Sequence, residues 1–169
     1  MSPTIRNQAK LAAIALVAAV ALAAPVDVAF AQSGHFNDRT WECTDIGTQV
    51  ECSGKVSGLG GTTFEVTLTA SGIGSVECTN AGGNTAPGQD TAINVAGSSG
   101  PQETPQNGNF TFDALTSAAP VVPNTPTCPN PGWTATVVDV MFTSDATLTL
   151  TEDGVVSDTL IVPIQSETM

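Results

Sequence analysis

The sequence has few basic residues. Of its 169 residues, 4 are Lys or Arg and 16 are Asp or Glu, which gives a formal net charge of −12. A surface of this sign repels phosphate backbones and anionic lipid headgroups, so the composition excludes nucleic-acid binding and disfavours an anionic membrane surface. Cationic protein partners, small-molecule ligands and weak association with divalent cations are compatible with it.

The sequence also has little of what common hydrolytic mechanisms need. It contains 1 histidine, no tyrosine and 2 tryptophans. A Ser-His-Asp or Cys-His mechanism would have to recruit His35, which lies close to the start of the predicted mature chain, where chains are usually mobile. Glu42 and Glu51 are predicted on the solvent face of a hairpin, where both stay ionised and do not form the acid pair of a glycosidase. We predict no catalytic residue and no cofactor.

No metal-binding motif is present. The four cysteines lack the Cys-x-x-Cys spacing of zinc sites. Acidic residues gather around one predicted hairpin, but without the Asp-x-Asp-x-Asp-Gly loop of calcium sites. They are Glu152, Asp153 and Asp158, with Asp139 and Asp145 on the strand before them. We expect no specific metal site.

Residues 1–31 have the pattern of a signal peptide. Two basic residues precede an uncharged apolar run from Leu11 to Ala24, and Ala29-Phe30-Ala31 matches a small-x-small cleavage site. Pro25 interrupts the apolar run before it reaches the ~20 residues that a membrane anchor needs. We predict a secreted or periplasmic product that is not inserted in the membrane and consists of one domain, 32–169. It has 15 acidic and 2 basic residues, a net charge of −13.

The predicted mature chain has the composition of a β protein. It contains 23 threonines, many alternating with apolar residues, and β-branched side chains suit a pleated, half-buried surface. No segment shows an apolar stripe at helical spacing. The pattern predicts one antiparallel β-sandwich, Ig-like or a similar Greek key, with seven to nine strands. The strands are expected near 40–46, 49–56, 62–70, 74–79, 91–96, 109–115, 133–150 (one strand or two) and 155–164.

In the last two expected strands, the apolar side chains fall at residue numbers of the same parity. Even-numbered positions such as Leu150 and Leu160 are apolar in both, so directly opposed residue numbers should add up to an even value. A two-residue turn at Asp153-Gly154 would make the sum of opposed residue numbers odd. We therefore predict a three-residue loop, 152–154, which pairs Leu150 with Val156.

The four cysteines predict two disulfides, for which three pairings exist. Gly47 suits the first central position of a type II′ turn, and this turn pairs Cys43 with Cys52 at a site whose short Cα separation fits a cross-strand bridge. Trp41 and Val50 then share a face with these cysteines. We predict the bridges Cys43–Cys52 and Cys78–Cys128.

Two segments, 79–108 and 117–132, lack strand periodicity, apart from one short apolar pair at Ile93 and Val95 in the first. The first is rich in Gly and Asn, and the second has five prolines, which favour an extended polyproline geometry. The bridge Cys78–Cys128 would tie the start of one to the end of the other, and loops displayed on a rigid scaffold usually carry recognition residues. We predict partner contacts at Asn80, Asn84, Pro126, Asn130 and Trp133. A place in the core is the first expectation for Trp133, and a flat apolar anchor is its role in this hypothesis.

The spacing of these residues resembles a family pattern. The stretch Cys78-Thr79-Asn80-Ala81-Gly82-Gly83-Asn84, then Asn107-Gly108, then Cys128-Pro129-Asn130-Pro131-Gly132-Trp133 is similar to one found in small secreted bacterial proteins, some with fungal relatives. The resemblance spans roughly residues 60–160 and implies a secreted β domain with a 78–128 bridge. It implies no activity, and the Cys43–Cys52 hairpin is not part of it.

These observations favour a non-enzymatic secreted or surface-associated protein with a binding or structural role. A small secreted carrier or inhibitor, with a specific ligand or protease target, is the alternative by analogy of fold class. A secreted hydrolase has the least support, because the sequence lacks a recognisable catalytic pattern.

Overall fold

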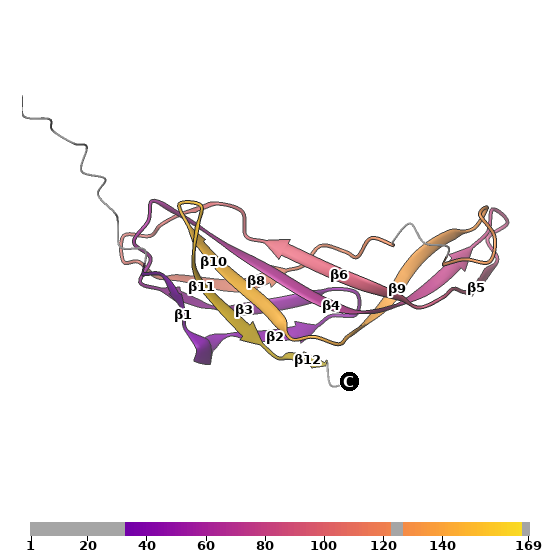
Figure 1. The fold of residues 1–169 in the computed structure, drawn as a ribbon, viewed down its shortest axis with the longest axis horizontal. Coiled ribbons are helices and arrows are strands. Elements are labelled where there is room, and N and C mark those ends of the chain that lie inside the picture. Colours follow the sequence, from indigo (N-terminus) through magenta and orange to yellow (C-terminus); the bar gives the residue numbers. More distant parts are fainter. Residues whose placement is uncertain (1–32, 123–126, 167–169) are drawn as a thin grey trace, which may run out of the picture.

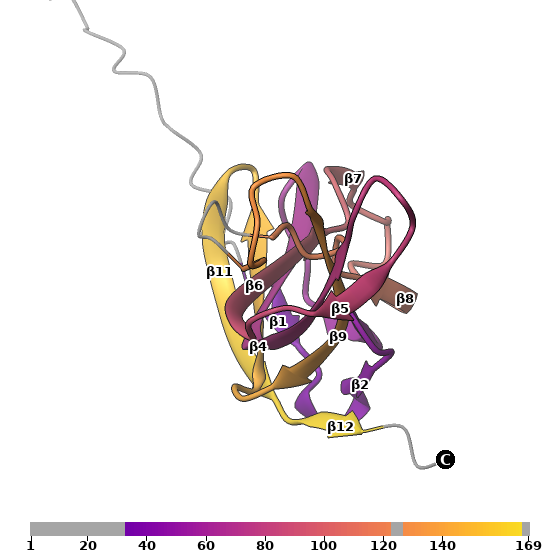
Figure 2. The ribbon, with the colours of Figure 1, turned by 90° about the vertical axis from the view of Figure 1, so that its right-hand side faces the viewer.

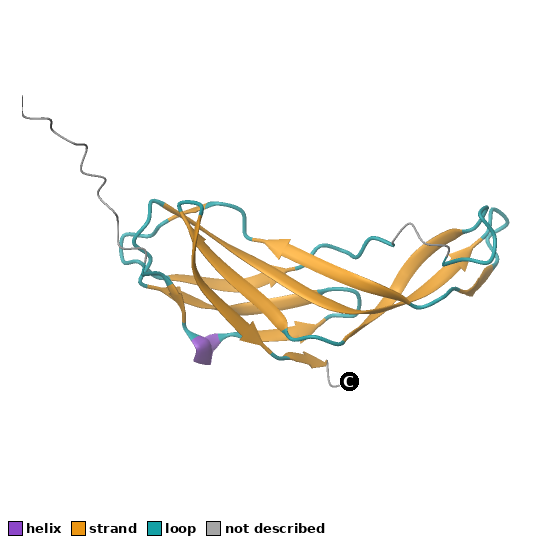
Figure 3. Cartoon of the chain, in the orientation of Figure 1, coloured by secondary structure: helices purple, strands orange, loops and turns teal. Residues whose placement is uncertain are grey.

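The computed structural model describes residues 33–122 and 127–166, which form an all-β sandwich (Figures 1 and 3). The predicted signal peptide and Pro126 lie outside the described residues. The described residues contain 12 strands and one 3₁₀ turn: β1 (His35–Phe36), η1 (Asp38–Thr40), β2 (Glu42–Asp45), β3 (Val50–Ser57), β4 (Thr63–Thr79), β5 (Thr85–Pro87), β6 (Thr91–Ser98), β7 (Gln102–Glu103), β8 (Phe110–Thr116), β9 (Thr134–Phe142), β10 (Ala146–Glu152), β11 (Val155–Val162) and β12 (Ile164–Ser166). The prediction of seven to nine strands missed the short strands β1, β5, β7 and β12.

The strands form a five-stranded and a seven-stranded sheet. In the first sheet the order is β12, β2, β3, β8, and β1 pairs with the end of β3. One pair departs from the predicted antiparallel arrangement, because β12 runs parallel to β2. The chain passes from one sheet to the other at Pro163, between β11 and β12, where a residue without an N–H ends the ladder.

The seven-stranded sheet is built around β4, which is a single strand of 17 residues. The sequence predicts two strands here, because Gly72 and Gly74 interrupt the apolar pattern. These glycines instead let neighbouring strands lie close, since a Cβ at Gly72 would be 2.6 Å from the backbone oxygen of Met141. Along one edge β4 pairs with β10 and then β9, and along the other with β7, β6 and β5.

Because β4 is so long, its second half extends beyond the five-stranded sheet (Figure 1). There it pairs with β9 on one side and β5 on the other. We call the three-stranded unit made of Ser75–Thr79, β5 and Thr134–Asp139 the distal arm. Figure 2 looks onto the end of this arm, where the loops that follow β4 and precede β9 lie side by side.

The core lies between the two sheets and follows the predicted alternation. Trp41, Cys43, Val50 and Cys52 are all buried, as their predicted common face requires. The ring of Trp41 packs against Phe36, with the ring centroids 5.4 Å apart, and its Nε1 donates a hydrogen bond to a backbone oxygen at 2.9 Å. The indole ring is thus packed in the core, and its N–H group has a hydrogen-bond partner there.

The first hairpin has the predicted register, and both predicted disulfides are present. Cys43 pairs with Cys52, their Cα atoms are 4.1 Å apart, and the second bridge joins Cys78 to Cys128. The N–H of Ile46 donates to the oxygen of Gln49 at 3.0 Å. Gly47 has a φ of +93°, as the first central position of a type II′ turn requires.

The prediction for the hairpin between β10 and β11 is wrong. The turn has two residues, Asp153 and Gly154, both with positive φ, and Glu152 pairs with Val155. A β-bulge after Leu150 then restores the parity, so Leu150 faces Asp158 rather than Val156. The parity requirement holds, but an extra residue in β11 meets it instead of a longer loop.

Candidate binding site at the distal arm

The turn that joins β4 to β5 is built around Asn80. Its Oδ1 accepts hydrogen bonds from the N–H of Gly82 at 2.9 Å and of Asn84 at 3.0 Å. The backbone N–H of Asn80 donates to the oxygen of Asn84 at 3.0 Å. Asn80 is half-buried and shapes the loop, whereas Asn84 is exposed.

The loop before β9 lies beside this turn. Thr134 pairs with Thr79, so the residues just outside these strands, Trp133 and Asn80, are neighbours at the end of the arm. The N–H of Trp133 donates to the oxygen of Asn130 at 3.1 Å. Asn130 is exposed, and Trp133 is half-buried and lies outside the buried core. Its partly exposed ring is therefore available for contact.

The disulfide Cys78–Cys128 anchors the second loop to β4. Cys78 is fully buried, and the oxygen of Thr127 accepts a hydrogen bond from the N–H of Gln89 at 2.8 Å. A cavity of about 440 Å³ lies at this junction. The residues lining it are Pro87, Gly88, Gln89, Thr127, Cys128 and Pro129. We call the surface formed by residues 80–84 and 128–133 the distal tip.

The distal tip carries no charge. The segments 78–89 and 117–138 contain no Asp, Glu, Lys, Arg or His, although the whole chain has a net charge of −12. The structure brings Asn80, Asn84, Asn130 and Trp133 to this end, while Pro126 lies outside the described residues. The tip can offer amide donors and acceptors beside an aromatic ring, without electrostatic steering.

Three of the acidic residues considered for calcium, Glu152, Asp153 and Asp158, accept hydrogen bonds from the protein. Asp158 Oδ2 accepts a hydrogen bond from the N–H of Phe36 at 2.8 Å. Asp153 lies at the turn after β10 and accepts hydrogen bonds from Thr62 and Thr63. Among residues 33–122 and 127–166, no three His, Cys, Asp or Glu side chains are grouped so that they could hold a metal ion. His35 is exposed, with Nδ1 3.1 Å from the oxygen of Ser33.

Glu152 was expected in a loop, but it lies at the end of β10 and its side chain is fully buried. Its carboxylate accepts hydrogen bonds from the N–H of Gly34 at 2.9 Å, Gly60 at 2.8 Å and Gly61 at 3.2 Å. The signal in the sequence is parity, since Glu152 continues the even-numbered inward positions of Leu148 and Leu150. It joins three segments that are distant in the sequence, which is a structural role.

The pKa of Asp153 leads to a prediction about the stability of the fold at low pH. Hydrogen bonds from the Thr62 hydroxyl, then from the backbone of Thr63 and Thr62, lower it from 3.8 to about 2. Because the folded pKa is the lower one, these bonds stabilise the fold above about pH 4, and this contribution is lost as the pH falls towards 2. Asp153→Asn, which tolerates the same positive φ, should be less stable than the parent protein at neutral pH.

Urea unfolding at a series of pH values checks this prediction. The stability difference between parent and Asp153→Asn should shrink between about pH 4 and pH 2 and vanish below that range. A difference that stays constant through this range would show that the charge of Asp153 does not contribute.

No family model, curated protein or solved structure matches the chain. The resemblance based on the cysteine, glycine and asparagine spacings therefore stays a prediction. In the part of the chain that the structure describes, no helix is long and apolar enough to cross a membrane.

Proposed function

We propose that the protein is a non-enzymatic secreted or surface-associated binding protein that contacts its partner through the distal tip. The two disulfides indicate an oxidising, non-cytoplasmic environment, where such bonds persist. The observation that carries the proposal is the convergence of Asn84, Asn130 and Trp133 on one uncharged end, tied by a disulfide to the longest strand.

The tip is suited to recognition because it is already ordered. Asn80 satisfies two backbone N–H groups of its loop, and the bridge at Cys128 holds the second loop against β4. A pre-organised surface loses less conformational entropy on binding than a mobile loop does. Aromatic rings and adaptable amides are also frequent at protein interfaces, so the tip fits a neutral polar partner surface.

The test uses purified protein immobilised on beads and exposed to culture fluid and cell-surface extract from the source organism. One variant combines Asn84→Ala, Asn130→Ala and Trp133→Ser, and leaves the loop-building Asn80 in place. We expect it to capture the partners of the parent protein at least about tenfold more weakly, which corresponds to about 1.4 kcal/mol.

A matched control removes exposed apolar side chains elsewhere, with Met141→Ser, Val156→Ser and Ile161→Ser. This control should capture partners as the parent does. If the tip variant retains every partner at the parent affinity while the control loses them, contact occurs on the outer face of the seven-stranded sheet and the proposal is wrong.

A further inference from the structure

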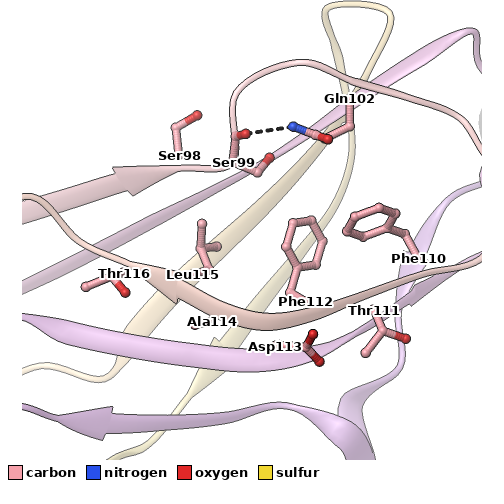
Figure 4. Close-up of a pocket in the computed structure, with 10 residues that line it drawn as sticks. All are labelled: Ser98, Ser99, Gln102, Phe110, Thr111, Phe112, Asp113, Ala114, Leu115 and Thr116. Atoms are coloured by element: carbon pink, nitrogen blue, oxygen red, sulfur yellow. Dashed lines mark hydrogen bonds between the residues drawn. The ribbon is translucent and has the colours of Figure 1, made fainter.

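An open groove of about 590 Å³ runs along β8 (Figure 4). Every residue of β8 lines it, and Ser98, Ser99 and Gln102, from the end of β6 to the start of β7, form the opposite wall. Gln102 Nε2 donates a hydrogen bond to the oxygen of Ser99 at 2.9 Å, which holds this wall in place. The groove therefore separates an edge of one sheet from an edge of the other.

Among the described residues, β8 has one ladder partner, β3. Successive peptide groups of a strand point to opposite sides, so those of β8 that do not face β3 face the groove. The neighbouring edge of β6 is different, because Ala118 donates its N–H to the oxygen of Ala96 at 2.8 Å and segment 117–122 begins there. The described residues thus flank the edge of β6 but leave β8 open.

The floor of the groove is aromatic. Phe110 is half-buried, and its ring centroid is 4.8 Å from that of Phe112 and 5.3 Å from that of Phe64. Phe112 and Leu115 are buried behind it. An apolar side chain placed against Phe110 would lose contact with water on a surface that is already rigid.

The charged side chains around the rim of the groove are mostly acidic, and the exception is Lys55, which pairs with Thr111 of β8. Asp113 is an exposed residue of the lining, and Thr116 Oγ1 donates to Glu51 at 3.2 Å. On the opposite wall, Ser98 donates to Glu65, and Glu103 follows Gln102. Basic side chains are complementary to this rim, whereas a second copy of the chain would bring Asp113 against Asp113.

We propose that an extended segment of a basic partner protein adds to β8 as a further strand, at a site separate from the distal tip. The main-chain groups of the partner would pair with the open side of β8, its apolar side chains would lie against Phe110, and its Lys or Arg side chains would meet Asp113 and the acidic rim. Strand addition draws affinity from main-chain hydrogen bonds and specificity from alternate side chains.

The probe is a synthetic peptide of the length of β8 in which lysine alternates with valine. Calorimetry should show that it binds the full mature protein at least about tenfold more tightly than the peptide with glutamate in place of lysine. Methylating alternate backbone nitrogens of the lysine peptide should weaken binding by at least about tenfold, because it blocks the main-chain pairing. Amide exchange should slow at β8 in the complex.

Two variants separate the groove from the general negative charge of the protein. Asp113→Lys and Asp139→Lys change the net charge equally, but Asp139 lies on the distal arm. Asp113→Lys should weaken binding of the lysine peptide about tenfold, and Asp139→Lys should weaken it much less. The tip variant with Asn84→Ala, Asn130→Ala and Trp133→Ser should bind the peptide as the parent does.

Three outcomes would overturn the inference. The first is equal loss of binding in the two aspartate variants, and the second is binding that backbone methylation does not change. The third is slowed exchange at the distal tip instead of β8. Each of these can occur whether or not the distal tip captures partners, so the two proposals fail independently.

Discussion

Replacing Cys78 and Cys128 together with alanine should lower the free energy of unfolding by about 4 kcal/mol. The bridge spans a sequence separation of 50 residues, and closing so long a loop removes much conformational freedom from the unfolded chain. In the folded protein it holds the loop of the distal tip against β4. Urea denaturation of the oxidised parent and the double variant, followed by circular dichroism, measures the difference.

The other bridge is the internal control. Cys43 and Cys52 are separated by 9 residues and join two strands that are already paired, so their replacement should cost less, about 3 kcal/mol. Amide exchange should also differ, with Cys78→Ala/Cys128→Ala releasing the amides of the distal arm before those of the sandwich. Equal losses, or release of the whole chain at once, would show that the arm does not depend on its bridge.

Glu152→Ala should destabilise the protein by about 3–5 kcal/mol. The substitution leaves the N–H groups of Gly34, Gly60 and Gly61 without their acceptor. The bond from Gly34 is buried and the other two are part-buried, and an unsatisfied buried donor costs about 1–3 kcal/mol. It also leaves a cavity at a side chain that is fully buried. Thermal unfolding should show a melting temperature lower by about 10 °C or more.

Two further variants test whether the lost hydrogen-bond acceptor causes the loss of stability. Glu152→Gln keeps an acceptor oxygen and most of the volume, so it should lose less stability than Glu152→Ala. Glu103→Ala removes an exposed carboxylate from β7 and should change stability by no more than about 0.5 kcal/mol. If Glu152→Ala behaved like Glu103→Ala, the three backbone donors would have found other acceptors.

A structural feature could be predicted from the sequence when the residues that determine it lie close together in the chain. The Cys43–Cys52 hairpin was predictable because a glycine turn, side-chain parity and a cross-strand bridge all lie within ten or so residues and agree. Parity could have predicted that Glu152 points inward, but not its partners, since its donor at Gly34 lies 118 residues away and only the folded chain brings the two together. The groove along β8 likewise depends on the spacing between two sheets.

The error at the last hairpin has a different origin, because the pattern admitted more than one structure. The parity of β10 and β11 was correct, but a bulge and a longer loop both satisfy it, and the sequence around Asp158 does not distinguish them. At the distal tip, Asn80 was predicted as a contact residue. Its side chain bonds the backbone of its own loop, and its role in partner contact stays a prediction.

If the distal tip binds a partner as proposed, the length of β4 has a mechanical consequence. At about 3.3 Å per residue, the 17-residue strand is about 55 Å long and runs from within the sandwich to the tip. A tensile force on the tip, directed along β4, would load its hydrogen bonds to β6, β9 and β10 in shear, so that many must break together. The same force directed across the strand would open them one at a time, and the attachment should therefore resist pulling far better along the long axis than across it.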